Sequence, residues 1–126
     1  MIEVLLDTSA LIEFFDGSEL GTTVCAAVED GVAAVSLISI AEFVDVAARR
    51  HQDVERQLTF LRRNVRLLPL TFETCTRVAV VKAEQRKKHP AFGINDAITY
   101  CTAREHHLTL LTKDKDFAGL DGVRVL

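Results

Sequence analysis

The sequence predicts an α/β fold in which a mainly parallel β-sheet is covered on both faces by helices. Short apolar runs alternate along the chain with longer segments of helical periodicity, and no repeat, low-complexity tract or Pro/Gly-rich linker interrupts them. Strands that are joined by helices usually pair in parallel, in a sheet with helices on both faces. A chain of 126 residues has the size of one domain, so we expect residues 1–126 to form a single domain.

The first part of the chain is expected to contain two strands and two helices. An apolar run at residues 2–6 is typical of a buried strand. Helical patterns follow at 8–15 and 20–30, and each ends at a turn that contains Gly. The next apolar run, at 32–38, predicts the second strand.

The middle of the chain continues the alternation. A third helix is expected to begin at Ser39, because apolar residues recur along one face after it. Another helical pattern covers 53–63, and an apolar run at 65–70 predicts the third strand. A long helix is expected from residue 71 or 72 to about residue 88.

The last part of the chain completes the sheet. Residues 89–93 contain Pro and Gly and break the long helix. A further helix is expected at 95–106, a fourth strand at 108–111 and an edge strand at 123–126. In parallel sheets of this kind, ligand sites lie outside the carboxyl ends of the strands.

Composition excludes some classes of function. The chain has 15 Lys and Arg against 18 Asp and Glu, a net charge of -3, so bulk positive charge does not hold nucleic acid. Any such contact must be local, through a metal ion or a small basic patch. The chain starts without the basic and apolar regions of a signal peptide, and no apolar stretch is long enough to span a bilayer. We therefore expect a cytoplasmic protein without a membrane contact.

The three cysteines are Cys25, Cys75 and Cys101, and they form no C-x-x-C pair. An odd number of cysteines without a signal sequence indicates reduced thiols. Each cysteine lies in an apolar helical pattern, so we expect each to be a small core residue.

Four acidic residues have local structural explanations. Asp7 is placed to cap the helix that follows it. Ser39 and Glu42 have the spacing of a capping box. Asp96 lies in the first turn of a helix, where the helix dipole favours acids, and Asp114 lies in a charged run that is typical of a solvated turn.

The position that these acids share is harder to explain by stability alone. Asp7, Glu42 and Asp114 follow apolar strands, and Asp96 opens a helix, so all four are expected at one edge of the sheet. Close carboxylates raise one another's pKa, and no equal number of cations is placed among them. A bound divalent cation removes this conflict, and oxygen-only ligands select Mg²⁺ or Mn²⁺.

Four segments resemble, in order, the motifs of PIN-domain proteins: residues 7–12 (DTSALI), 39–43 (SIAEF), 95–103 (NDAITYCTA) and 110–117 (LLTKDKDF). The resemblance covers nearly the whole chain, and the spacing of the set is specific. The compact length is most similar to VapC-type toxins, the ribonuclease half of toxin–antitoxin pairs.

The resemblance implies a three-layer α/β/α sandwich that cleaves RNA with Mg²⁺ or Mn²⁺. Carried over by position, the catalytic and metal-binding acids are Asp7, Glu42, Asp96 and Asp114. Asp116 matches a position that varies among related chains and is a further candidate ligand, and Ser9 and Thr112 match small hydroxyl positions beside the site. Similar proteins form homodimers and are blocked by a small antitoxin that also binds DNA.

Two lysines are candidates for contact with the RNA phosphates. Lys113 and Lys115 flank Asp114, next to the expected site. Other basic residues lie near helix ends, where they complement the helix dipole and stay solvated.

Three other classes of function are alternatives to a nuclease. A receiver-type signalling domain needs an acidic pair near the first strand and an Asp that ends the third, but Asp7 stands alone and residues 68–72 contain no Asp. A phosphohydrolase with an aspartyl nucleophile needs a second acid at position 9, where this chain has Ser9. A PIN-fold module that binds RNA or protein with little catalysis stays open as an alternative.

Overall fold

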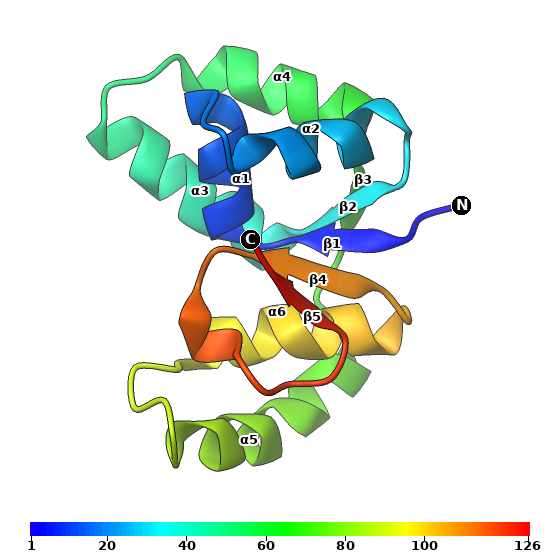
Figure 1. Cartoon of the computed structure of the whole chain (residues 1–126), viewed down its shortest axis with the longest axis vertical. Helices are drawn as coiled ribbons and strands as arrows, with labels where there is room; N and C mark the ends of the chain where they lie inside the picture. The colour runs from blue at the N-terminus through cyan, green and yellow to red at the C-terminus, as the bar shows by residue number, and fades with distance from the viewer.

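Five short strands form the centre of the molecule, in the order β3-β2-β1-β4-β5 (Figure 1). The computed structural model describes residues 1–126. The strands are β1 (Val4–Leu6), β2 (Ala33–Ser36), β3 (Arg66–Leu68), β4 (Thr109–Thr112) and β5 (Val123–Val125). Every neighbouring pair is parallel, which confirms the predicted parallel sheet and its edge strand.

Six α-helices form the two outer layers. Their bounds are α1 (Thr8–Asp16), α2 (Gly21–Glu29), α3 (Leu37–Arg49), α4 (Val54–Asn64), α5 (Phe72–Arg86) and α6 (Ile94–Glu105), and a 3₁₀ turn, η1, covers Lys115–Phe117. Figure 1 shows α1 to α4 on one face of the sheet and α5 and α6 on the other. The fold is therefore the three-layer α/β/α sandwich that the sequence predicted. None of these helices has both the length and the apolar character needed to cross a membrane.

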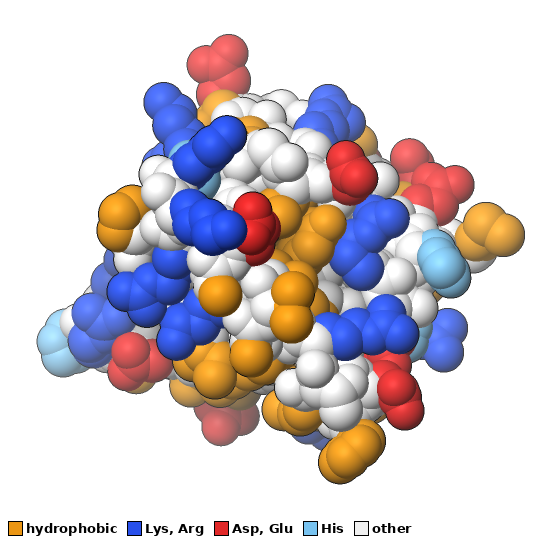
Figure 2. Space-filling view, turned by 90° about the horizontal axis from the view of Figure 1, so that it is seen from below, with side chains coloured by type: hydrophobic (Ala, Val, Ile, Leu, Met, Phe, Trp, Pro, Cys, Tyr) orange, Lys and Arg blue, Asp and Glu red, His pale blue; other side chains and the backbone are white.

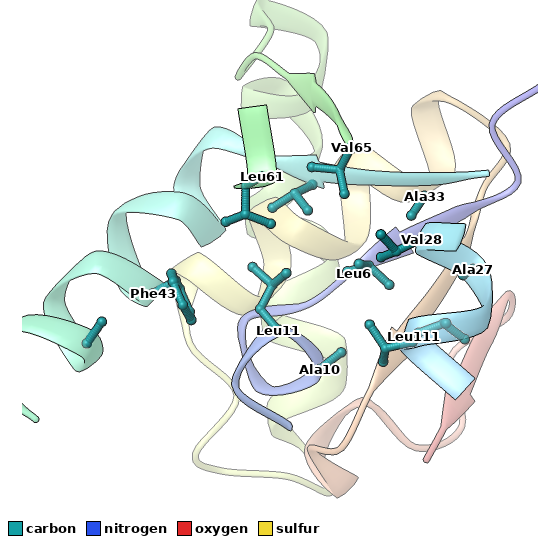
Figure 3. Close-up of a cluster of buried hydrophobic side chains, with 13 residues drawn as sticks. Leu6, Ala10, Leu11, Ala27, Val28, Ala33, Phe43, Leu61, Val65 and Leu111 are labelled. Carbon is teal, nitrogen blue, oxygen red and sulfur yellow. The ribbon is translucent and has the colours of Figure 1, made fainter. Parts of the chain in front are cut away.

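Two hydrophobic clusters hold the layers together, one on each face of the sheet. Leu6 and Leu111 join the cluster under α1 to α4, which Figure 3 shows. Leu5 and Leu110, one residue earlier in the same strands, join the cluster under α6. Because both faces are covered, these strands appear in the sequence as unbroken apolar runs. Burial of each such Leu contributes about 1.5–3 kcal/mol.

Helix α3 begins two residues before the predicted start at Ser39. Strand β2 ends at Ser36, which pairs with Leu68, and the Ser36 side chain accepts a hydrogen bond of 3.3 Å from the Ser39 amide. Ser36 is therefore the N-cap, and the predicted strand at 32–38 was too long at its end. The Ser39 hydroxyl is buried and lies 3.5 Å from that of Thr99 on α6.

The three cysteines differ in exposure, although the sequence predicted a core position for each. Cys101 is buried, Cys25 is half-buried and Cys75 is exposed. All three are free thiols. The prediction was wrong for Cys75 because α5 covers the sheet from outside α6, and the outer face of α5 remains open to solvent.

Candidate active site

The acids gather where the connections of the sheet change direction. Strands β2 and β3 lie on one side of β1, and β4 and β5 lie on the other. Leu6 at the end of β1 pairs with Leu111 in β4. The residues that follow these two strands, Asp7 and Thr112–Asp114, are therefore neighbours at the point where parallel sheets usually bind ligands.

Asp7 is buried, with 6% of its surface exposed. It occupies the N-cap position of α1, but its side chain makes no capping hydrogen bond. Instead, one carboxylate oxygen, Oδ2, accepts hydrogen bonds from the hydroxyls of Thr112 (2.8 Å) and Ser9 (3.0 Å). Burial raises the pKa of Asp7, the two hydroxyls oppose this increase, and the charge of Glu42 adds to it. The capping explanation of Asp7 was therefore wrong.

The two hydroxyl residues connect the end of β1 to the loop after β4. Their oxygens lie 3.1 Å apart. The Lys113 amide donates to Ser9 Oγ (2.9 Å), and the Asp114 amide donates to Thr112 Oγ1 (3.0 Å). Ser9 and Thr112 thus fix both the carboxylate of Asp7 and the backbone that carries Asp114.

Asp96 lies in the first turn of α6 and is half-buried. Its Oδ2 accepts a hydrogen bond of 2.8 Å from the Gly93 amide, so the structural explanation from the sequence is correct in part. Burial raises the pKa of Asp96, the Gly93 amide opposes this, and the charges of Asp7, Asp114 and Asp116 raise the pKa further. These acids therefore share one electrostatic environment.

Glu42 is held against the start of α1. Its Oε1 accepts a hydrogen bond of 2.8 Å from the Thr8 hydroxyl. The predicted capping box with Ser39 does not form, because Ser36 caps α3. Glu42 lies close enough to Asp7 for its charge to raise the pKa of that residue.

Asp114 and Asp116 lie in the short segment after β4. The Asp116 amide donates to Asp114 Oδ1 (2.8 Å), so Asp114 caps η1. One oxygen of the Asp116 carboxylate is 3.6 Å from Nδ1 of His89. Through this contact, a His side chain reaches the acidic segment, residues 113–118.

The two candidate lysines differ in their surroundings. Lys113 Nζ forms an ion pair with Glu13 of α1, whose surface is only 9% exposed. The hydrogen bond from Lys113 is the main reason that the pKa of Glu13 is lowered. Lys115 is exposed and forms no ion pair, so it is the freer of the two to contact a phosphate.

Sequence reasoning missed two residues that touch the acidic segment. Glu13 binds Lys113, and Gln85 of α5 donates to backbone carbonyls of Asp116 and Ala118. Both are polar residues buried in helices, which a local pattern does not distinguish from solvated ones. The burial of such a residue points to a role beside the site, but it can be recognised only when the packing of the helices on the sheet is known.

The donor set fits a hard divalent cation in its chemistry. All the candidate ligands are carboxylates, which suit Mg²⁺ or Mn²⁺. Asp7 is buried without a cationic partner among its hydrogen bonds, while nearby Lys113 is bound to Glu13. As the side chains lie, no group of three or more His, Cys, Asp or Glu residues is close enough to hold a metal ion.

The chain is a parallel α/β sandwich with acids at the carboxyl edge of its sheet. The sequence model of the PIN domain matches residues 4–123, and the chain belongs to the PIN-domain family. The resemblance that the four motifs indicated is thereby confirmed. No curated protein matches the chain.

Several solved structures of similar fold are of toxins or toxin–antitoxin complexes. A toxin–antitoxin complex from Klebsiella pneumoniae has 26% identity and a TM-score of 0.75, over 98% of this chain and 97% of that chain. DNA-bound VapBC from Salmonella typhimurium has 18% identity and a TM-score of 0.72, over 100% and 98%. VapC20 from Mycobacterium tuberculosis, a toxin that cleaves the sarcin–ricin loop, has 16% identity and a TM-score of 0.72, over 98% of each chain. The last two show similarity of fold alone.

Proposed function

We propose that this chain is a metal-dependent endoribonuclease and the toxin of a type II toxin–antitoxin pair. The observation that carries the proposal is the environment of Asp7. Its carboxylate is buried, is fixed by two hydroxyls, and has acids rather than bases around it. Such an arrangement costs stability in the absence of a ligand, because close carboxylates repel one another. Membership of the PIN-domain family and the similar toxin structures support the same function.

In this proposal, Asp7 and Asp96 hold the principal ion, Mg²⁺ or Mn²⁺, and Glu42 and Asp114 complete the site directly or through water. When bound, the ion supplies Lewis acidity and lowers the pKa of a water molecule. Asp116 is a further ligand candidate at the rim of the site.

The residues around the acids determine their geometry. Ser9 and Thr112 hold the Asp7 carboxylate, and the Gly93 amide holds that of Asp96. Lys115, which is exposed beside Asp114, would contact a phosphate of the RNA. Attack of water on phosphorus with loss of the 3′ oxygen gives 5′-phosphate and 3′-hydroxyl ends.

Two protein partners are part of the proposal. The similar structures from Klebsiella pneumoniae and Salmonella typhimurium are a toxin–antitoxin complex and DNA-bound VapBC, which supports a cognate antitoxin for this chain. The outer face of α5 exposes Phe72 and Val80, at 81% and 75%. Figure 2, which views the molecule from the α5 side, shows apolar side chains gathered in the middle of this face. An exposed apolar face of this kind is typical of a protein interface, and we assign it to a homodimer.

One observation favours a second candidate function, a PIN-fold module that binds RNA or protein with little catalysis. The acids do not lie close enough to one another to form a complete ligand set. Cleavage of structured RNAs in Mg²⁺, in Mn²⁺ and in EDTA separates the two functions. We expect cleavage with either ion and none in EDTA. RNA that is bound but left intact in Mg²⁺ and Mn²⁺ would favour the binding module.

A further inference from the structure

The acidic loop, residues 113–118, has few hydrogen bonds of its own. Its regular part is η1, a single 3₁₀ turn of three residues. The backbone hydrogen bonds within it are those from Phe117 to Asp114 (3.3 Å) and from Ala118 to Lys115 (3.0 Å). Hydrogen bonds in 3₁₀ turns have poor geometry. Contacts with other elements therefore help to set where Asp114 and Asp116 lie.

Gln85 makes two of these contacts, both with the later half of the loop. It lies near the end of α5, and only 9% of its surface is exposed. Its amide nitrogen donates to the carbonyl oxygens of Asp116 (2.7 Å) and Ala118 (2.9 Å). Both amide hydrogens are thus used on two carbonyls of one loop, on either side of Phe117. A glutamate at this position would have no hydrogen to donate and would repel both oxygens.

Other contacts of the loop agree with this role. The Phe117 ring packs edge-to-face on Phe92, with ring centroids 5.3 Å apart, and both rings are fully buried. At the start of the loop, Lys113 is bound to Glu13. The loop is therefore anchored at both ends, and Gln85 supplies the hydrogen bonds to its later half.

We propose that Gln85 is a positioning residue that sets where Asp116 lies and, through the hydrogen bond from the Asp116 amide, how the Asp114 carboxylate is held. This inference rests on the proposed metal-dependent function. The side chain touches neither ion nor RNA, and acts through the two carbonyls that it binds. Loss of these bonds lets the loop move away. The acids of the loop then adopt the geometry that binds a divalent ion less often.

The variant that tests this is Gln85→Met, which keeps the length of the side chain and removes both donors. The matched control is Thr74→Val, because Thr74 also lies buried on α5 but donates to Glu105 (3.0 Å) instead of the loop. Calorimetric titration with Mn²⁺ alone, thermal unfolding and hydrogen exchange of residues 113–118 are compared for both variants and the wild type. Cleavage is measured across a range of Mn²⁺ concentrations.

We expect Gln85→Met to weaken Mn²⁺ binding roughly tenfold, the lower end of the loss typical when a residue that orients metal ligands is removed. Exchange in the acidic loop should accelerate, and kcat should recover at high Mn²⁺ with the KM for RNA unchanged. Thr74→Val should destabilise the fold without changing Mn²⁺ affinity or exchange in the loop.

Equal Mn²⁺ affinity in the two variants would overturn the role of Gln85 and leave the nuclease proposal intact. A wild-type protein that binds no Mn²⁺ would overturn the metal-dependent function itself. In that case the exchange data still decide about positioning, and unchanged exchange in Gln85→Met refutes it.

Discussion

The hydroxyl of Thr112 donates a 2.8 Å hydrogen bond to the carboxylate of Asp7, 105 positions earlier in the chain. The bond forms because β1 and β4 are parallel neighbours with Leu6 opposite Leu111. The same hydroxyl oxygen accepts from the Asp114 amide. A single Thr thus contacts two of the five candidate ligands, Asp7 through its carboxylate and Asp114 through its amide.

Replacement of Thr112 by Val should affect both stability and cleavage. The variant leaves the buried Asp7 carboxylate with one hydroxyl donor, so we expect a loss of about 1–3 kcal/mol in the free energy of unfolding. Cleavage should fall roughly 10–100-fold, as for other residues that orient metal ligands. Urea unfolding and initial rates measure the two effects. Thr109→Val, at the exposed start of the same strand, is the control, and an undiminished rate in Thr112→Val would contradict the role of the hydroxyl.

Asp7→Asn should separate catalysis from stability. The pKa of Asp7 is raised in the folded state, so the fold disfavours its charged form. The resulting cost in the free energy of folding is absent below the unfolded pKa. It grows as pH rises towards the folded pKa and is complete above it. The variant should therefore be more stable than the wild type at pH 7, and the difference should vanish as pH falls below about 4.

Cleavage by Asp7→Asn should decrease more than about 100-fold, beyond the loss typical of residues that only orient ligands. Chemical unfolding at several pH values and initial rates measure both effects. Asp30→Asn, an exposed acid after α2, serves as the control and should change neither. Full activity of Asp7→Asn would refute the assignment of the site.

Two variants of Asp96 distinguish its charge from its cap. Asp96→Asn keeps an oxygen that can accept from the Gly93 amide, whereas Asp96→Ala loses it. We expect both to abolish cleavage, but only the alanine variant to lose about 1 kcal/mol of stability, the usual cost of a lost helix cap. Thermal unfolding and rates test this. Retained cleavage in Asp96→Asn would show that only the cap matters.

The salt dependence of RNA binding tests the lysines. Lys115→Gln should flatten the plot of log affinity against log salt by roughly 0.7, the value for one phosphate contact on a single strand. Charge reversal at both Lys113 and Lys115 should weaken binding further, although Lys113→Glu also places two carboxylates together at Glu13. The control is Arg62→Gln on α4. An unchanged slope in Lys115→Gln would remove this lysine from the RNA contact.

The assembly state tests the apolar face of α5. We expect the wild type to sediment as a dimer and Val80→Asp to sediment as a monomer, because Val80 is 75% exposed and a charge there would be buried in the interface. The melting temperature of the monomeric variant checks that the fold persists. A wild type that is strictly monomeric would contradict the proposed dimer.

The alternation of strands and helices was sufficient to predict the sheet and the edge at which Asp7, Glu42, Asp96 and Asp114 lie. Parallel strands end at a common edge, so a residue that follows a strand can be placed without coordinates. The cap of α3 could not be predicted in this way. Ser36 and Ser39 both fit the preference for an N-cap, and the pairing of Ser36 with Leu68 decides between them.

The supporting contacts of the site were equally hidden. Glu13 and its partner Lys113 are 100 positions apart, and Gln85 is 31 positions from Asp116. Helical periodicity describes only neighbours within a few turns, so it treats both residues as ordinary polar positions. The identity of their partners depends on how the layers pack, and that is a property of the whole fold.

The central place of β1 has a practical consequence for engineering. The strand lies between β2, which leads to Glu42, and β4, which leads to Asp114. A cut in the exposed turn around His51, between α3 and α4, would leave Asp7 and Glu42 on one fragment and Asp96 and Asp114 on the other. Neither piece alone would contain the proposed catalytic set. Restored cleavage would therefore report on the meeting of two proteins to which the halves are fused.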